Sequence, residues 1–421
     1  MHRKGLSLIV LLVVTLLAVT PVLAAHTAPG TSTQPQQEEG VVVIAPGESI
    51  QIGLAASLSG DVIPEAGQDI RNAAQLAVDQ FNEEMGGIEG FPVELLVEDD
   101  QCIPEQAGNV ANLFVTEPRL VAVVGHMCSG ATAVAAEIYE EARIPMVSAS
   151  ATNGQLTAAG FTVFNRTVSN DDVQGLVVGR YIAAVLEAET LAVLHDNSDY
   201  GRGLAETVAA IAAEEGVNVL EPQAIDPAEQ DYRAVLTVIA GEAPDVLYFG
   251  GYQNEAALIV DQMREVGMED TIFFSADGVL IQQFLDLAGD AAEGSHLSLP
   301  AAEVDEEVNE TFDAAYEEAF GLAPDELGPF HAQSADAAAV IIQALMEVAT
   351  LDDAGNLVID REELITAIRA TEGYEGVSGT ITCNEIGECS AARVQVFIVE
   401  DGEFVQLEVP EELQMVGDSM E

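Results

Sequence analysis

The sequence predicts an α/β protein in which two doubly wound parallel sheets form separate lobes around a ligand-binding cleft. Short apolar runs alternate with longer stretches of helical periodicity, the pattern of parallel strands covered by helices on both faces. Seven such runs, followed by a mostly helical stretch over Glu303–Ala349, are more than one doubly wound sheet usually needs. Nearly every run ends in a cluster of small or hydrogen-bonding residues, which indicates where a ligand binds.

The expected elements follow one another in regular order. The strands are the apolar runs Ile50–Ala56, Val93–Val97, Val121–Val124, Pro145–Val147, Leu191–Leu194, Val246–Phe249 and Thr271–Phe274. Helical periodicity covers Ile70–Phe81, Glu105–Val115, Ala131–Ala142, Leu204–Glu215 and Glu255–Val266. A break near Val168–Val173 opens a new helix after the fourth run, which favours two sheets. A hairpin is expected over Val394–Val399 and Phe404–Val409, turning at Asp401–Gly402.

The N-terminus has the features of a signal peptide over residues 1–24. Arg3 and Lys4 supply a basic start, Leu6–Leu17 an apolar stretch, and Val22–Ala24 a small-residue cleavage pattern. We therefore expect an exported protein. An uncleaved membrane anchor is the alternative, although the apolar run is short for a membrane span.

The chain is strongly acidic, with 13 Lys and Arg against 72 Asp and Glu and a formal net charge of −59. Such a surface repels nucleic acid and anionic membranes, so neither is expected as a partner. A salt-rich habitat and a generally acidic lineage both explain this composition. Residues 25–49 are rich in Thr, Pro, Gln and Glu, and we expect a flexible leader there, with ordered structure from near Ile50.

The four cysteines form two local pairs in the sequence, Cys102 with Cys128 and Cys383 with Cys389. Export favours disulfides, and local pairing is one of three connectivities. A zinc site is the alternative, but no histidine stands at ligand spacing beside either pair. No metal or cofactor is expected, because phosphate-loop, complete dinucleotide-glycine and metal-ligand patterns are absent from the sequence.

Polar clusters follow the predicted strands, at Ser57–Gly60, Gly125–Gly130, Ser148–Thr152, His195–Asn197, Gly250–Tyr252 and Ser275–Gly278. Ligands of open α/β sheets bind beyond the carboxyl ends of the strands, where helix N-termini favour anions such as carboxylates. Ser129 and Thr152 at such junctions are either helix caps or ligand contacts, and the two roles are compatible.

Other residues in these clusters also have two interpretations. Asp277 is either a turn residue or a counter-ion for a ligand ammonium group. Tyr200 and Tyr252 are core aromatics or line the cleft, and their places after strand ends favour the cleft. Nucleophilic chemistry by Cys128 or Ser129 beside His126 is not expected, because Gly-x-Ser-x-Gly is absent there. We therefore expect a binding protein and not an enzyme.

Several segments resemble the periplasmic branched-chain amino acid binding proteins, the Leu/Ile/Val-binding members of the type I periplasmic binding fold. The most specific segment is Val124–Ser129, followed by Glu137–Glu140. Supporting matches are Asp99–Cys102, Ala151–Thr152, Val193–Asp196 with Tyr200–Gly203, and Gly250–Tyr252. The resemblance covers about residues 50–400 and keeps the order of the motifs.

The resemblance implies two lobes that are joined by three crossings and close on an amino acid, the closed form being recognised by an ABC-type permease. We expect residues 50–170 with 301–390 in the first lobe, 171–300 with 391–410 in the second, and a tail over 411–421.

The resemblance also implies roles for individual residues. Ser129 and Thr152 would bind the ligand carboxylate, and Ser150 would use its backbone. Tyr200 and Tyr252 would line the second lobe, Asp277 would face the ammonium group, and Phe330 would contact the ligand side chain. The Cys102–Cys128 pair matches the family disulfide, whereas Cys383–Cys389 is a local addition.

Two departures from the family pattern bear on the choice of ligand. The family commonly has Glu where this chain has Asp277, one methylene shorter. A family Tyr is replaced near Ala66, with one extra residue in Asp61–Glu65. We expect a monomeric solute-binding protein for a small amino acid, with branched aliphatic ones first. A sensory receptor of the same fold for an amide, short peptide or other small molecule is the alternative, and a linked signalling domain would distinguish it.

Overall fold

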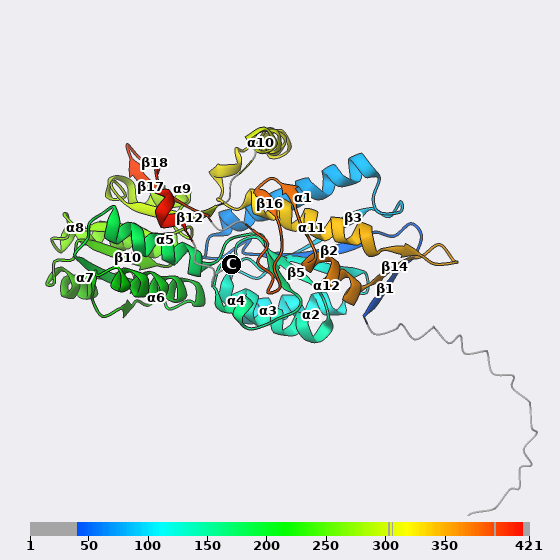
Figure 1. The fold of residues 1–421 in the computed structure, drawn as a ribbon, viewed down its shortest axis with the longest axis horizontal. Coiled ribbons are helices and arrows are strands. Elements are labelled where there is room, and N and C mark those ends of the chain that lie inside the picture. Colours follow the sequence, from blue (N-terminus) through cyan, green and yellow to red (C-terminus); the bar gives the residue numbers. More distant parts are fainter. Residues whose placement is uncertain (1–39, 302–303, 305, 391–392, 416–421) are drawn as a thin grey trace, which may run out of the picture. The chain divides into compact units, whose positions relative to one another are not determined.

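The computed structural model describes residues 40–301, 304, 306–390 and 393–415, and the expected signal peptide lies outside them. Within these residues the chain builds two large sheets covered by helices (Figure 1). The first sheet has five parallel strands, in the order β3 (Val93–Asp99), β2 (Ile50–Ala56), β4 (Leu120–Gly125), β5 (Met146–Ser148) and β6 (Phe164–Arg166).

Helices cover both faces of the first sheet, because its central strands are apolar on both sides. One core cluster joins alternate side chains of β2 to α1 (Pro64–Met85) and α11 (His331–Val348). A second cluster joins the opposite face to α2 (Pro104–Thr116) and α3 (Ser129–Ala142). Helix α12 (Arg361–Arg369) contributes to both clusters. In Figure 1, α1 and α11 lie on the opposite side of β2 from α2 and α3.

The second sheet has eight strands. Its parallel centre is β7 (Thr190–His195), β10 (Val246–Gly250), β11 (Ile272–Ser275) and β12 (His296–Ala301). The short strands β8 (Asn218–Val219) and β9 (Gln223–Ala224) pair with β7, and a hairpin of β17 (Arg393–Glu400) and β18 (Glu403–Leu407) pairs antiparallel with β12. One face packs on α5 (Asp171–Ala184) and α6 (Asp199–Glu214), and the other on α7 (Arg233–Ala240), α8 (Gln253–Glu265) and α9 (Gln282–Ala288).

The chain passes between the two sheets three times, after β6, after β12 and before β17. Helix α10 (Glu306–Phe320) follows the second passage and shares a small apolar cluster with α1. The pair of β15 (Tyr374–Gly376) and β16 (Gly379–Ile381) precedes the third passage. The predicted fold class of two parallel-sheet units is confirmed. The expected residue boundaries of the lobes stay a prediction.

The expectation of a flexible leader up to residue 49 is wrong for its last part. Strand β1 (Val41–Ile44) pairs antiparallel with β14 (Leu357–Asp360), which also pairs with β13 (Thr350–Leu351). The side chains of Val42 and Ile44 are buried because alternate residues of this strand join the core under α11 and α12. Ordered structure therefore begins before Ile50. At the other end, the hairpin predicted to turn at Asp401–Gly402 is confirmed, and α13 (Glu411–Gln414) lies in the expected tail.

We expect Ile44→Ala to lower the free energy of unfolding by about 2–5 kcal/mol, because it removes a wholly buried side chain and leaves a cavity. Val43 on the same strand is 39% exposed, so Val43→Ala is the matched control. The control should change the free energy by less than about 0.5 kcal/mol. Urea denaturation of the two variants measures both values. Equally small effects would contradict the assignment of β1 to the core.

Candidate functional site

A small cavity lies where the carboxyl ends of strands from the two sheets meet. Its lining residues are Ile63, Met127, Cys128, Ser129, Ser150, Tyr200, Tyr252, Asp277, Gly278 and Phe330. Six of the seven ligand-binding residues predicted from the sequence are among them, and Thr152 is the exception. The structure thus brings together residues from positions 129 to 330, while their contacts with a ligand stay predictions.

The wall from the first sheet is formed by the loops after β4 and β5. Ser129 is the first residue of α3, and its Oγ accepts a hydrogen bond from the N–H of Asn153 at 3.3 Å. The Oγ of Ser150 donates to the carbonyl of Met127 at 3.0 Å, so this side chain is already bonded to the protein. The first N–H groups of a helix have no partner within the helix and attract anions. The start of α3 is therefore the part of this wall that favours a carboxylate.

Thr152 lies behind this wall. Its side chain is wholly buried and interacts with the carboxylate of Asp171. Its carbonyl accepts a hydrogen bond from the N–H of Asp171 at 2.9 Å. Thr152 thus joins the loop after β5 to the first residue of α5.

The wall from the second sheet carries two tyrosines. The rings of Tyr200 and Tyr252 are tilted by 36° with their centroids 5.4 Å apart. The Tyr200 hydroxyl accepts a hydrogen bond from the N–H of Gly278 at 3.1 Å. A Cβ on Gly278 would lie 2.7 Å from the carbonyl oxygen of Gly251, so only glycine allows this close approach. The tyrosines therefore form an apolar surface of fixed orientation.

Two buried acids lie at this site. Asp277 follows β11, and its Oδ1 accepts a hydrogen bond from Nε2 of Gln174 at 2.9 Å. Burial raises the pKa of the Asp277 carboxyl to about 6. Burial, followed by the charge of Asp277, raises the pKa of Asp171 well above its ordinary value. The neighbouring Thr152 hydroxyl and the charge of Arg166 lower this pKa only in part. Two carboxylates in one buried region favour a positively charged ligand group.

Sequence reasoning missed Asp171 and Gln174. Asp171 follows Asn170, whose Oδ1 accepts hydrogen bonds from the N–H groups of Asp172 and Val173 and caps α5. Acidic residues are common in the first turn of a helix. The sequence Asn-Asp-Asp therefore indicates helix capping, and it does not indicate that Asp171 lies near Asp277 at a ligand site. Gln174 is three residues further along the helix and gives no separate signal.

Phe330 and Ile63 supply the apolar part of the cavity. Phe330 directly precedes α11, and its side chain is buried. Ile63 belongs to the Asp61–Glu65 loop that departs from the family pattern, and it lines the cavity. In the same loop, the carbonyl of Asp61 accepts a hydrogen bond from Nδ2 of Asn254 in α8 at 2.8 Å. The altered loop therefore covers the cavity and bonds to the second sheet's helix.

The structure assigns His126 and Cys128 to other roles. Nδ1 of His126 lies 2.6 Å from Oδ2 of Asp100, and its Nε2 lies 2.9 Å from the hydroxyl of Tyr139. Cys128 is bonded to Cys102, and Cys383 to Cys389, so both predicted disulfides are confirmed. In the described part of the chain, no group of three or more His, Cys, Asp or Glu side chains is placed to hold a metal ion. Nor does any helix in that part have the length and apolar character to span a membrane.

Two parallel-sheet units that share a small cavity with acidic and aromatic walls define the class of bilobal solute-binding proteins. Residues 49–395 match the family described as periplasmic binding protein, and the chain belongs to this family. The resemblance inferred from the sequence is therefore confirmed.

Three of the similar proteins are named for the amino acids that they bind. A leucine-, isoleucine-, valine-, threonine- and alanine-binding protein of Pseudomonas aeruginosa is 32% identical over 341 residues, which are 81% of this chain and 87% of the relative. A leucine-binding protein of Thermotoga maritima matches the structure with a TM-score of 0.76 and 26% identity, over 86% of this chain and 99% of that one. A branched-chain amino acid transporter substrate-binding protein of Streptococcus pneumoniae in complex with isoleucine matches with a TM-score of 0.73 and 26% identity, over 86% of this chain and 100% of that one.

We expect Asp277→Asn to stabilise the ligand-free protein at pH 8. The folded pKa of about 6 lies above the ordinary 3.8, so ionisation opposes folding increasingly from pH 4 to 6 and fully above pH 6. The gain in unfolding free energy is at most about 3 kcal/mol, because one pKa unit corresponds to about 1.4 kcal/mol. It should disappear near pH 4.

Thermal or urea unfolding from pH 4 to pH 8 measures this difference. Asp353→Asn at an exposed position is the control and should leave stability unchanged at every pH. A difference between Asp277→Asn and the unsubstituted protein that does not vary with pH would contradict the role assigned to burial.

Proposed function

We propose that this chain is an exported solute-binding protein that captures a small aliphatic amino acid and delivers it to an ABC permease. One observation carries the proposal: the buried Asp277 lines a cavity whose lining residues include no Lys, Arg or His, and its charge acts on a second buried acid, Asp171. A ligand ammonium group supplies the positive charge that these carboxyl groups need.

The opposite wall suits the ligand carboxylate. Ser129 and the first N–H groups of α3 offer hydrogen-bond donors at the positive end of the helix. Ser150 contributes through its backbone, since its hydroxyl is bonded to Met127. Thr152 contributes indirectly, because its carbonyl bonds to Asp171 and so holds the ligand-binding loop next to α5. An α-amino acid presents an ammonium and a carboxylate group on one carbon, and it therefore bridges the two walls.

The remaining lining residues suit an aliphatic side chain. Phe330, Ile63 and Met127 are apolar, and the rings of Tyr200 and Tyr252 add an apolar surface. A charged ligand side chain would be buried without a partner in this part of the cavity, which is costly. Leucine, isoleucine and valine are therefore the first candidates. The names of the relatives from Pseudomonas aeruginosa and Streptococcus pneumoniae support this choice.

Capture occurs by closure of the two lobes, with the boundaries expected from the sequence. Polar contacts already join the elements that face each other across the cavity. Nδ2 of Asn254 donates to the carbonyl of Asp61, and Nδ2 of Asn153 donates to the carbonyl of Asp199 at 2.5 Å. A ligand that contacts both walls only in the closed state stabilises that state by its differential binding.

The same proposal includes three further properties: the chain is exported by its signal peptide, it is monomeric, and it delivers its ligand to a permease. Catalysis does not, because Cys128 is in a disulfide and both ring nitrogens of His126 are in hydrogen-bond contact with protein groups. A sensory receptor that binds an amino acid in the same cavity is the second candidate, and the same ligand screen applies to it.

We expect leucine, isoleucine or valine to raise the melting temperature by several degrees. A ligand that binds only the folded state at 100 times its Kd adds about 2.7 kcal/mol of stability. A thermal-shift screen of amino acids measures the effect. Two analogues of leucine are matched controls: 4-methylpentanoate lacks the ammonium group and leucinamide lacks the carboxylate. Neither should raise the melting temperature. A response to the amide but to no amino acid would favour the receptor with another ligand.

We expect Asp277→Asn to weaken leucine binding by about 30-fold or more, because losing one partner of a buried charge pair costs about 2–5 kcal/mol. Calorimetric titration measures Kd. In the unsubstituted protein the affinity should fall below about pH 6, where protonation of Asp277 competes with the ammonium group. Asp277→Glu keeps the charge and serves as control. Unchanged affinity in Asp277→Asn would remove Asp277 from the ammonium role.

A further inference from the structure

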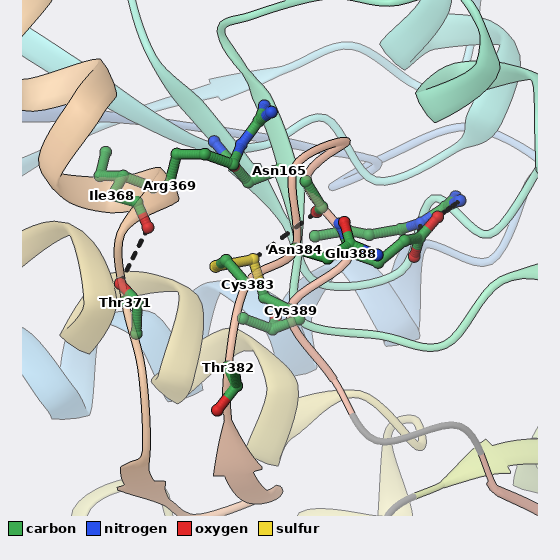
Figure 2. The surroundings of a disulfide bond; sticks show 12 residues. Asn165, Ile368, Arg369, Thr371, Thr382, Cys383, Asn384, Glu388 and Cys389 are labelled. Carbon is green, nitrogen blue, oxygen red and sulfur yellow. Dashed lines mark hydrogen bonds and ion pairs between the residues drawn. A yellow bond between two sulfur atoms is a disulfide. The ribbon is translucent and has the colours of Figure 1, made fainter. Parts of the chain in front are cut away.

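The loop closed by the Cys383–Cys389 disulfide lies outside the cavity, and the proposed function does not use it. Figure 2 shows the disulfide with Asn384 and Glu388 next to it. Asn384 closes the loop by two kinds of bond. Its N–H donates to the carbonyl of Glu388 at 2.8 Å, and its Oδ1 accepts from the N–H of Glu388 at 3.1 Å. The disulfide and these hydrogen bonds give Glu388 a defined position.

The loop is bonded to the end of β6, where the chain leaves the first sheet. The N–H of Arg166 donates to the carbonyl of Gly387 at 2.9 Å, and the N–H of Cys389 donates to the carbonyl of Arg166 at 3.0 Å. A Cβ at Gly387 would lie 2.4 Å from the carbonyl oxygen of Phe164, so the loop is pressed against the strand. Arg369, labelled in Figure 2, donates to the carbonyls of Glu385 and Phe164 and adds a second connection.

The Glu388 carboxylate receives donors from three segments. Nε of Arg166 donates to its Oε2 at 2.8 Å, and Nη2 of Arg166 donates to its Oε1. Thr157 Oγ1 and Asn170 Nδ2 donate to Oε1 at 2.9 and 3.0 Å. The Arg166 side chain is wholly buried, and that of Glu388 is 15% exposed. Burial by itself raises the pKa of Glu388, but the donors from Arg166, Asn170 and Thr157 outweigh it and lower the pKa.

Arg166 carries this connection to the ligand-binding loop. Its Nη1 donates to the carbonyl oxygens of Ala151 and Asn153, both at 2.9 Å, on either side of Thr152. Asn170, another partner of Glu388, caps α5, whose first residue, Asp171, donates its N–H to the carbonyl of Thr152. Glu388 therefore bonds to Arg166, which holds the loop around Thr152, and to Asn170, which caps the helix that begins with Asp171.

We propose that Glu388, held in place by the Cys383–Cys389 disulfide, is a positioning residue for the ligand-binding loop Ser150–Asn153 and for the start of α5. A buried guanidinium needs a carboxylate partner. Without the charge of Glu388, Arg166 has to recover solvation or pair with Asp171, whose pKa it already lowers through its charge. Either movement releases the carbonyls of Ala151 and Asn153. The consequence for ligand affinity rests on the proposed function, whereas the consequence for the loop does not.

The first test is amide hydrogen exchange on the ligand-free full chain. In Glu388→Gln, peptides covering residues 150–157 and 167–173 should exchange about fivefold faster or more, because buried hydrogen bonds are lost. Cys383→Ser/Cys389→Ser should act in the same direction. Glu362→Gln is the matched control, since Glu362 pairs with Arg143 through two hydrogen bonds elsewhere in the fold. It should leave both segments unchanged.

The second test is leucine affinity by calorimetry. Glu388→Gln should raise Kd by about two- to thirtyfold, the range of substitutions that act on a site through other residues. Glu388→Asp keeps the charge and should restore part of the affinity. If Glu388→Gln fails to fold, Cys383→Ser/Cys389→Ser takes its place in both tests. If the unsubstituted chain binds no aliphatic amino acid, the proposed function fails, and the exchange experiment alone decides the inference.

Three results would overturn the inference. Unchanged exchange over residues 150–157 in Glu388→Gln would mean that the carboxylate does not hold the loop. A uniform rise in exchange over the whole chain would mean that Glu388 contributes only to global stability. Equal effects of Glu388→Gln and Glu362→Gln on the loop would mean that the effect is not specific to the disulfide-held carboxylate.

Discussion

Two buried carboxyl groups without a cation beside them determine most of what this site can do. Burial raises the pKa of both Asp171 and Asp277, the charge of Asp277 raises that of Asp171 further, and the cavity lining contains no Lys, Arg or His. The nearest guanidinium whose charge reaches Asp171 belongs to Arg166, and Glu388 already neutralises it. Since desolvated charges of one sign are unfavourable, the folded protein is poised to accept a compact cation.

The net charge of the chain does not explain this selectivity. A zwitterionic amino acid has no net charge, so the field of a protein with a formal charge of −59 neither attracts nor repels it strongly. Selectivity has to come from two separated local features, the acids of one wall and the start of α3 on the other. A ligand with only one of the two charged groups satisfies one wall and leaves the other without a partner.

Much of this arrangement could be predicted from the sequence, because parallel strands place their carboxyl ends at one edge of a sheet. Polar residues after predicted strands therefore pointed to five residues that line one cavity, and the family resemblance added Phe330. Other features carried no such signal. Strand β6 contains buried Asn165 and Arg166, and β12 contains Ser298 and Pro300, so neither is an apolar run. Their polar residues are explained only by partners far away in the sequence, such as Glu388 for Arg166.

The bonds around α5 connect the two walls of the cavity, and they bear on the lobe closure proposed above. Asp171 belongs to a helix that packs on the second sheet, yet its N–H is bonded to Thr152 in the ligand loop of the first. Asp277 is tied to the same helix through Gln174, three residues from Asp171. Asp171 is therefore bonded to the ligand loop of the first sheet. Asp277 is connected to that loop through Gln174 and a single turn of α5. Because rigid elements transmit displacement to what they hold, the proposed lobe closure would change the distance between the two walls at the start of α5.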